Sequence, residues 1–227
     1  MPGPQTSVGE WASTLFAIDA LAPAPRFLVL SGSLPPGVLA QGAAELVRRA
    51  NGRGTRVMLD TSGLPLALAL DAGVYLVKPS LGELAALASK PLVDKVAWLA
   101  AARQIVAERR AHIVALTLGH RDALLVSPDE EIRVKALPVP VSSATGAGDC
   151  FLAGLIVALR RGDGRRDAVH LVQAEASATL LSAGTALCDA EAVNRLYEKS
   201  RMWKTVRRAF RPCVQGECAV DRNVPSG

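Results

Sequence analysis

The chain has 227 residues, of which 50% are hydrophobic and 21% are charged, a balance that is typical of a globular protein and not of a long disordered chain. No apolar run reaches the roughly 18 residues of a membrane-spanning helix, and the start, MPGPQTSVGEW, lacks the basic and apolar blocks of a secretory signal. The four cysteines have no paired spacing, which argues against a disulfide scaffold and a zinc site. We expect a reducing, cytoplasmic setting and no membrane partner.

The formal net charge of +5 is concentrated at one end of the chain. Residues 199–227 contain seven basic and two acidic residues, whereas residues 1–198 contain 19 of each sign. We therefore predict a folded body over residues 1–198 and a basic, poorly ordered tail over residues 199–227. The tail mixes basic and aromatic residues, as a nucleic-acid contact does, but we favour a solvated end because a short basic run without a fold carries little specificity.

Short apolar runs alternate with amphipathic segments along the body. Buried strands are predicted at Phe27–Leu30, Arg56–Asp60, Val74–Val77 and His112–Thr117. An antiparallel pair is predicted at Ala123–Val126 and Ile132–Ala136. Helices are predicted at Val38–Ala50, Pro65–Ala72, Leu81–Ala88, Val93–Arg109, Ala147–Arg160, Asp167–Ser182 and Ala190–Lys199.

The repeated strand–helix units predict an α/β fold, with a mostly parallel, Rossmann-like sheet flanked by helices. Ligands in such folds bind at the carboxyl ends of the strands. Polar or glycine-rich segments follow several of the predicted strands, namely Ser31–Ser33, Asp60–Gly63, Lys78–Ser80 and Thr117–Gly119. We therefore expect the functional site at this edge of the sheet.

The segment Ser142–Phe151, SSATGAGDCF, opens a long apolar helix. Gly146 and Gly148 allow the backbone to approach a ligand closely, and the unpaired N–H groups of a helix start attract phosphate. Asp149 lies at the edge of this site, where a carboxylate takes a proton from an attacking hydroxyl during phosphoryl transfer. The segment is equally compatible with a plain glycine-rich turn in which Asp149 caps the helix, so on its own it leaves both interpretations open.

Other stretches occur with this one in a fixed order along the chain: VLSGSLPPGV, LDTSG, VKPSLGEL, VALTLGHRDALL, SATGAGDCFLAG and SATLLSAGTALC. Together they resemble the ribokinase-like sugar kinases of the phosphofructokinase-B type. The first two are similar to the branch that contains 1-phosphofructokinase, tagatose-6-phosphate kinase and the minor 6-phosphofructokinase. The resemblance covers about residues 3–197, and ordered motifs are far more specific than a single one.

The resemblance implies a role for each matching residue. Asp149 is implied as the catalytic base, and an anion hole over the transferred phosphate is implied for Gly146, Ala147 and Gly148. Ser33 is an implied sugar-phosphate contact, and Glu83 is the implied acid that organises water and Mg²⁺. The implied nucleotide-binding residues are Lys78, Ser80, Glu83, Thr117, Gly119 and Ser177, so Glu83 has both roles.

Each of these residues also has a purely structural interpretation. Lysines are usually solvated, an acidic residue in the first turn of a helix is favoured by the helix dipole, and a serine in a turn bonds to local backbone. Threonine is a good strand residue, and a small residue such as Ser177 often serves helix packing. Only the joint order of the motifs favours the functional roles.

The sequence also departs from the family pattern. We find no counterpart of the family's opening third, which carries the first strands, a sugar-binding loop and a β-lid, so we expect a sheet without those strands and without the lid. Ser80 stands in place of the family's asparagine and Glu175–Ala176 in place of a small Ala–Gly pair. These differences weaken the expected metal-water organisation and narrow the approach to the adenine.

The resulting expectation is phosphorylation of a sugar phosphate, fructose 1-phosphate or a related hexose phosphate, with ATP and Mg²⁺ as cofactors. A monovalent-cation site near Gly184 stays open. One alternative is a catalytically weak or inactive nucleotide-binding remnant, and another is a subunit that needs a partner chain for the lid. A homodimer and an interaction protein defined by the basic tail also stay open.

Overall fold

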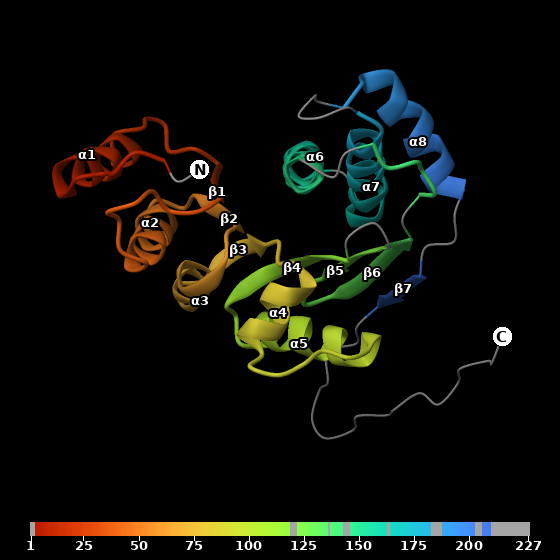
Figure 1. Cartoon of the computed structure of the whole chain (residues 1–227), viewed down its shortest axis with the longest axis horizontal. Coiled ribbons are helices and arrows are strands. Elements are labelled where there is room, and N and C mark those ends of the chain that lie inside the picture. Colours follow the sequence, from red (N-terminus) through yellow and green to blue (C-terminus); the bar gives the residue numbers. More distant parts are fainter. Residues whose placement is uncertain are drawn as a thin grey trace.

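The structure is a computed structural model that describes residues 3–118, 122–135, 137–142, 146–162, 164–182, 188–202 and 206–209 (Figure 1). The strands are β1 Phe27–Ser31, β2 Arg56–Asp60, β3 Val74–Val77, β4 Ala111–Thr117, β5 Asp122–Val126, β6 Glu130–Lys135 and β7 Val206–Ala209. The helices are α1 Val8–Asp19, α2 Gln41–Gly52, α3 Gly63–Asp71, α4 Leu81–Leu87, α5 Lys95–Ala107, α6 Ala147–Arg161, α7 Arg165–Leu181 and α8 Ala190–Met202.

Within the described residues, the seven strands form one mixed sheet in the order β1-β2-β3-β4-β5-β6-β7. The strands β1 to β4 pair in parallel, and β4 to β7 pair antiparallel. The predicted α/β class and the predicted pairing of β5 with β6 are therefore confirmed. The parallel arrangement covers the first half of the sheet, where β1, β2 and β3 are each followed by a helix.

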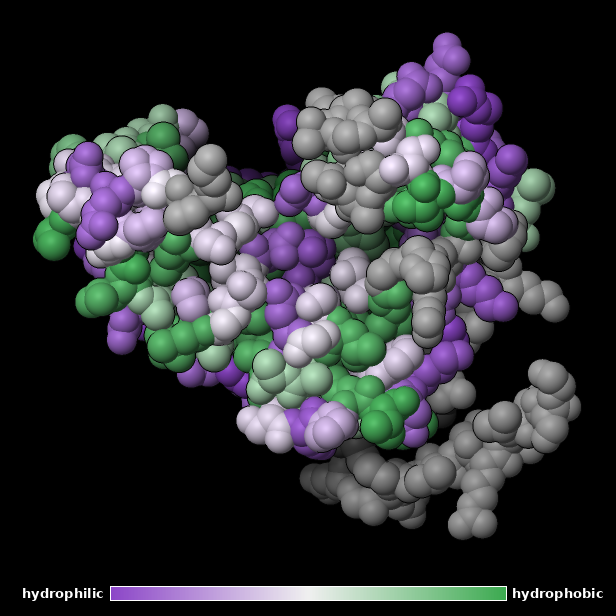
Figure 2. Space-filling model, viewed as in Figure 1, coloured by the Kyte–Doolittle hydropathy of each residue, from purple (hydrophilic) through white to green (hydrophobic). Residues whose placement is uncertain are grey.

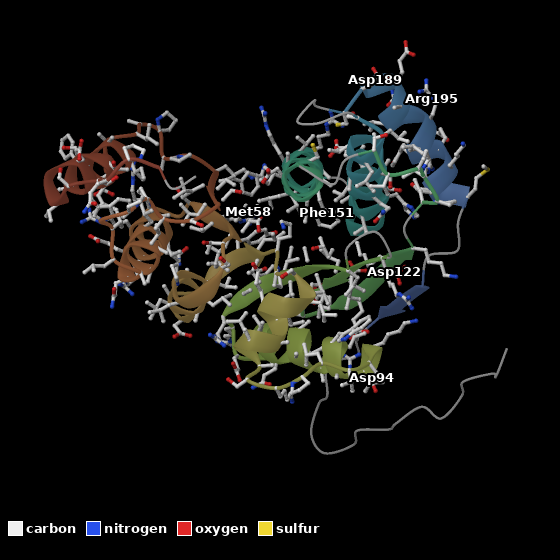
Figure 3. All side chains as sticks on the ribbon, in the orientation of Figure 1. Met58, Asp94, Asp122, Phe151, Asp189 and Arg195 are labelled. Atoms are coloured by element: carbon white, nitrogen blue, oxygen red, sulfur yellow. The ribbon has the colours of Figure 1, made fainter. Side chains whose placement is uncertain are left out.

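Helices cover the sheet on both faces, which explains the continuous apolar runs of the parallel strands. On one face, α2, α3, α4 and α5 enclose a core that includes Val57, Leu59 and Val114. On the other face, α6 and α7 pack over Met58 of β2, and Phe151 of α6 belongs to the same cluster (Figure 3). Helix α8 packs on α7 at a distance from the sheet. Among the described helices, none is long and apolar enough to cross a bilayer.

The N-terminal helix α1 was not among the predicted elements. Ser7 and Glu10 form a capping box at its start, because the Ser7 hydroxyl accepts from the Glu10 amide and the Glu10 carboxylate accepts from the Ser7 amide. This Ser-x-x-Glu spacing is a readable helix signal. The helix lies beside α2 at the β1 end of the sheet (Figure 1), where β1 is an edge strand and Val29 is 43% exposed.

The described part of the expected tail is regular. Helix α8 continues to Met202, and residues 206–209 form β7, which pairs antiparallel with β6 in the register Glu131↔Arg208. The division into a body over residues 1–198 and a basic tail over residues 199–227 stays a prediction. The tail residues Trp203, Lys204, Phe210 and Arg211, with their mixed basic and aromatic character, lie outside the described residues.

A partly buried acidic residue lies between α6 and α7. The Glu175 carboxylate of α7 occupies the space that a side chain at Gly154 of α6 would fill. Burial raises the pKa of Glu175 to about 7, against the opposing effect of the Arg161 charge. An acid whose pKa is raised on folding keeps its proton in the folded state while the unfolded chain loses it. Stability therefore falls as the pH rises from about 4.5 towards 7.

We predict that Glu175→Gln abolishes this part of the pH dependence. The amide is uncharged and of similar size, so the variant should match the parent chain at pH 5 and exceed its free energy of unfolding by about 2 kcal/mol at pH 8, a figure discounted for partial solvent exposure. Urea unfolding at both pH values measures the difference. The exposed Glu198→Gln serves as the control and should change neither value. Equal pH slopes for Glu175→Gln and the parent chain would contradict the prediction.

Candidate active site

The carboxyl ends of the parallel strands bring several polar residues to one edge of the sheet. Ser31 ends β1, Asp60 ends β2, and the two are register partners. Lys78 directly follows β3, and Thr117 ends β4. The edge faces a hollow in the surface where hydrophilic residues gather between the N-terminal helices and α6 (Figure 2). Because parallel strands end together, residues far apart in the sequence become neighbours here.

The start of α6 completes this edge. Gly146, the residue before the helix, has φ of 79°, a left-handed conformation that glycine adopts without the strain of a side chain. The Cys150 amide donates to the Gly146 carbonyl over 2.9 Å. The amides of residues 147–149, which come before it in the first turn, have no partner within the helix. These amides and the positive end of the helix dipole form a place for an anion. Residues 143–145, just before it, lie outside the described residues.

Asp149 sits in the first turn of α6 and faces the sheet edge. The Ser31 hydroxyl donates to the Asp149 carboxylate over 3.4 Å. One residue earlier, a Cβ placed on Gly148 would lie 3.3 Å from the Lys78 ammonium nitrogen. The helix start therefore meets the ends of both β1 and β3. The carboxylate of Asp149 and the ammonium group of Lys78 flank the same turn of α6.

A buried ion pair forms the floor of the site. The Lys78 ammonium lies 3.0 Å from the Asp60 carboxylate, and the Lys78 residue is 7% exposed. Burial raises the pKa of Asp60 above its usual value, and the charges of Asp149 and Glu83 act in the same direction while Lys78 opposes them. A buried cation needs such a partner, because an unpaired charge is costly inside a protein. The structural interpretation of Lys78 as a solvated surface charge is therefore wrong.

Glu83 and Ser80 have a local structural role. The Glu83 carboxylate accepts from the Ser80 amide over 2.7 Å, and the Ser80 hydroxyl accepts from the Glu83 amide over 3.3 Å. This capping box starts α4. Ser80 also forms a parallel bridge to Thr117, which places the two beside each other. Within the described part of the chain, no group of three or more His, Cys, Asp or Glu residues is arranged to hold a metal ion.

Ser33 and Ser177 make no hydrogen bond to Asp149 among the described residues. Ser33 is exposed in the segment after β1, and among the described residues its side chain has no hydrogen-bond partner. Ser177 is 1% exposed inside α7, where its hydroxyl accepts from the Gln173 amide group over 3.4 Å. In this conformation it is closed to a dissolved nucleotide. Gly119 and Gly184 lie outside the described residues.

Two residues of the site were not assigned a role from the sequence. Ser31 and Asp60 were recognised only as parts of the SGSLPPG and LDTSG motifs. Their shared signal is their position, because each is the last residue of a parallel strand and the two are register partners. A polar residue that ends a buried parallel strand is a candidate site residue on that ground alone.

Comparison with known proteins agrees with this geometry. Residues 4–192 match the family described as pfkB family carbohydrate kinase. The chain is 37% identical over 201 residues to the ATP-dependent 6-phosphofructokinase isozyme 2 of Mycobacterium tuberculosis, covering 87% of this chain and 58% of that protein. It is 40% identical over 171 residues to the 1-phosphofructokinase of Xanthomonas campestris, covering 72% of this chain and 52% of that protein.

Solved structures show the same fold. The phosphofructokinase-2 of Escherichia coli, in complex with substrates and products, superimposes with a TM-score of 0.84 at 32% identity, covering 88% of this chain and 65% of that one. The chain thus spans between about half and two thirds of the length of these relatives. From the family match, the shared fold and the edge formed by Asp149, Lys78 and the α6 start, we conclude that the chain belongs to the pfkB family of carbohydrate kinases.

Proposed function

We propose that this chain carries the phosphoryl-transfer site of a sugar-phosphate kinase that uses ATP and Mg²⁺ and takes fructose 1-phosphate or a related hexose phosphate as acceptor. The observation that carries the proposal is the convergence of Asp149, Gly148 and Lys78 at the start of α6. A carboxylate, a set of unpaired amides and a buried cation are the three parts that phosphoryl transfer needs in one place.

Asp149 is the proposed base. It lies at the rim of the anion site, and its carboxylate already accepts a hydrogen bond from a hydroxyl, that of Ser31. An acceptor sugar that displaces this contact would present its own hydroxyl to the same carboxylate. The hydroxyl oxygen then attacks the γ-phosphorus of ATP as its proton passes to Asp149. The bond between the γ-phosphorus and the bridging oxygen breaks, and ADP leaves with the electron pair of that bond.

Lys78 and the α6 amides are the proposed stabilisers of the transferred phosphoryl group. The Lys78 ammonium is fixed by Asp60 and lies against Gly148. A cation held in place before the reaction stabilises the charge that develops in the transition state without having to reorganise. This arrangement gives Asp60 the role of a positioning residue for Lys78.

Mg²⁺ fits this site as a companion of ATP. The ion is usually held by substrate phosphates and one or two carboxylates with several waters, and it would supply charge neutralisation at the phosphates. Glu83 is the acid proposed to organise the waters of the ion without binding it directly. One of its carboxylate oxygens accepts from the Ser80 amide, and the other would accept from a water of the ion. The E. coli relative has been crystallised in complex with potassium. A monovalent-cation site near Gly184, which lies outside the described residues, stays a proposal for this chain.

We predict that Asp149→Asn lowers kcat by roughly 10²- to 10⁴-fold with little change in ATP binding, because the amide cannot accept the proton. The assay measures ADP release with Mg·ATP and a panel of hexose phosphates. The exposed Asp71→Asn, at the opposite edge of the sheet and paired with Arg110, is the matched control and should keep full activity. Equal activity of the two variants would contradict the role of Asp149.

The parent chain has its own outcome in this assay. Sugar-dependent ADP release supports the proposed kinase. A folded chain that binds ATP without sugar-dependent release would instead support the nucleotide-binding alternative. Activity that returns on addition of a second chain carrying the remaining family segment would support a partner that completes the site.

We predict that Lys78→Met weakens ATP binding by roughly 10- to 100-fold, since charge-assisted hydrogen bonds contribute about 1.5–3 kcal/mol. The substitution also leaves Asp60 buried without its cation, so the double variant Asp60→Asn with Lys78→Met is needed to restore folding stability. Calorimetric titration with ATP measures the affinity. Lys90→Met, at an exposed lysine, is the control. Unchanged ATP affinity in a folded double variant would exclude Lys78 from the nucleotide site.

A further inference from the structure

Two cysteines that are far apart in the sequence lie together in the fold. Cys150 is in the first turn of α6, directly after Asp149, and Cys188 comes just before α8. Their thiols are hydrogen-bonded to each other, and the Cys188 thiol also shares a hydrogen bond with the side chain of Thr179 in α7. Both are free cysteines. The pair is therefore a product of the packing, which explains why the cysteine spacing along the chain gives no sign of it.

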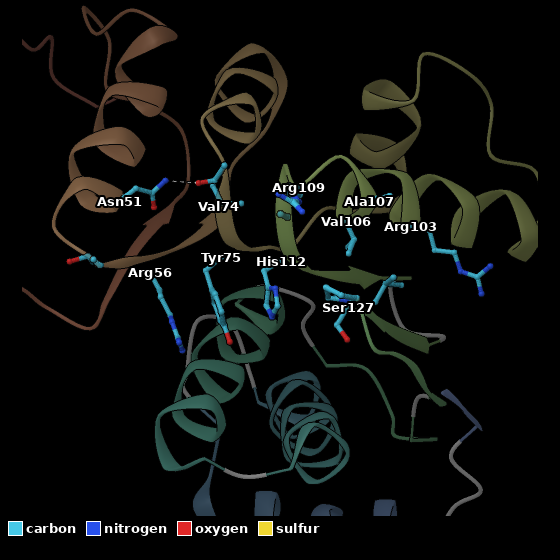
Figure 4. A pocket seen from close by; sticks show the side chains of 16 residues that line it. Asn51, Arg56, Val74, Tyr75, Arg103, Val106, Ala107, Arg109, His112 and Ser127 are labelled. Atoms are coloured by element: carbon cyan, nitrogen blue, oxygen red, sulfur yellow. Dashed lines mark hydrogen bonds between the residues drawn. The ribbon is translucent and has the colours of Figure 1, made fainter. Parts of the chain in front are cut away.

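The packing of α6 on α7 directs Cys150 towards its partner. Figure 4 shows the two helices side by side beneath the sheet, in the colours of Figure 1. A Cβ placed on Gly146 would lie 3.9 Å from the Thr179 methyl group, and a Cβ placed on Gly154 would meet the Glu175 carboxylate. Cys150 lies four residues from each glycine, so it shares their face of α6. That face is the one that meets α7.

Cys188 reaches the same place from the other side of α7. It packs against the cluster that contains Ala174 and Ala178 of α7, and its thiol meets Thr179. Cys188 belongs to no helix or strand, so no ladder of backbone hydrogen bonds fixes its position. Two thiols in contact need only a small movement to reach the S–S bond length of about 2.05 Å.

The surroundings of the pair suit oxidation more than metal binding. Cys150 and Cys188 are both partly exposed, so a small oxidant reaches them from solution. In the part of the chain that the structure describes, they belong to no cluster of three or more metal-ligating residues. Accessible cysteines with a second thiol beside them are the typical sites of reversible oxidation.

We propose that Cys150 and Cys188 form a modification site, at which oxidation by hydrogen peroxide joins the two thiols in a reversible disulfide. One thiolate attacks an oxygen of the peroxide, which breaks the O–O bond and gives a sulfenic acid and a water. The second thiol attacks the sulfenic sulfur, and the sulfenic oxygen leaves as a second water. The two cysteines together lose two electrons and two protons, which the peroxide takes up.

The disulfide acts on the start of α6. Drawing the two sulfurs together moves Cys150, and its neighbour in the chain, Asp149, moves with it. A misplacement of about 1 Å at a reacting group can lower a rate by roughly 10²-fold, so we expect the oxidised chain to turn over at least about 10-fold more slowly. This effect on turnover rests on the proposed function, whereas formation of the disulfide does not.

The test treats the full reduced chain with hydrogen peroxide, alkylates the remaining thiols and identifies disulfides by mass spectrometry of an unreduced tryptic digest. Trypsin places Cys150 and Cys188 in separate peptides, residues 136–160 and 167–195. The two cysteines near the C-terminus fall in neither peptide. The proposal expects the two peptides to become linked on oxidation and to separate again with dithiothreitol. Oxidation that leaves Cys150 and Cys188 alkylated, or links them only to other cysteines, would overturn the site.

Two variants show whether the link controls turnover. Cys188→Ser should keep the turnover of the reduced parent chain and lose its response to peroxide. The matched control, Cys213→Ser with Cys218→Ser, changes two cysteines outside the described residues and should keep both the link and the slower turnover. An active chain whose turnover does not change when the link forms would overturn the effect on α6. A linked chain that is inactive even when reduced would contradict the proposed function and still support the modification site.

Discussion

The common edge at which the parallel strands end is the constraint on which the site depends. Strands covered by helices on both faces have little freedom to slide, because a shift of one residue would exchange side chains such as Met58 and Leu59 between two close-packed cores that fit different shapes. Their carboxyl ends therefore stay aligned, and Ser31, Asp60 and Lys78 are held at fixed relative positions. The α6 start meets this edge at the ends of β1 and β3, through Asp149 against Ser31 and Gly148 against Lys78.

One lysine and several carboxylates lie close together at that edge of the sheet. Lys78 is the cation of the floor, and Asp60, Asp149 and Glu83 are near enough to influence one another. Burial is the largest influence on the Asp60 carboxyl, which is why its pKa rises even beside a lysine. The pair thus fixes a positive charge beside the α6 start, and the cost is the desolvation of the Asp60 carboxylate. Such a balance is common where a protein prepares a site for a charged substrate.

Much of this arrangement could be predicted from the sequence, and the missed parts have physical reasons. The strands β2 and β3 were predicted at their observed residues, because continuous apolar runs with polar ends leave little freedom. Asp149 and Lys78 were predicted as site residues from ordered motifs. The partnership of Lys78 with Asp60 was not, because it depends on which strands become neighbours. The burial of Ser177 depends in the same way on the packing of α7, which no local pattern contains.

The strand order has a consequence for how the chain folds. The order of the strands in the sheet equals their order in the sequence. The parallel pairings of β1 to β4 each enclose one or two helices, whereas the antiparallel pairings of β4 with β5 and of β5 with β6 close short turns. Contacts of this kind form early and rapidly. The pairing of β6 with β7 differs, since α6, α7 and α8 lie between them in the chain. A nascent chain emerging from the ribosome can therefore assemble its sheet progressively from β1 to β6, and β7 joins only after the last helix has been synthesised.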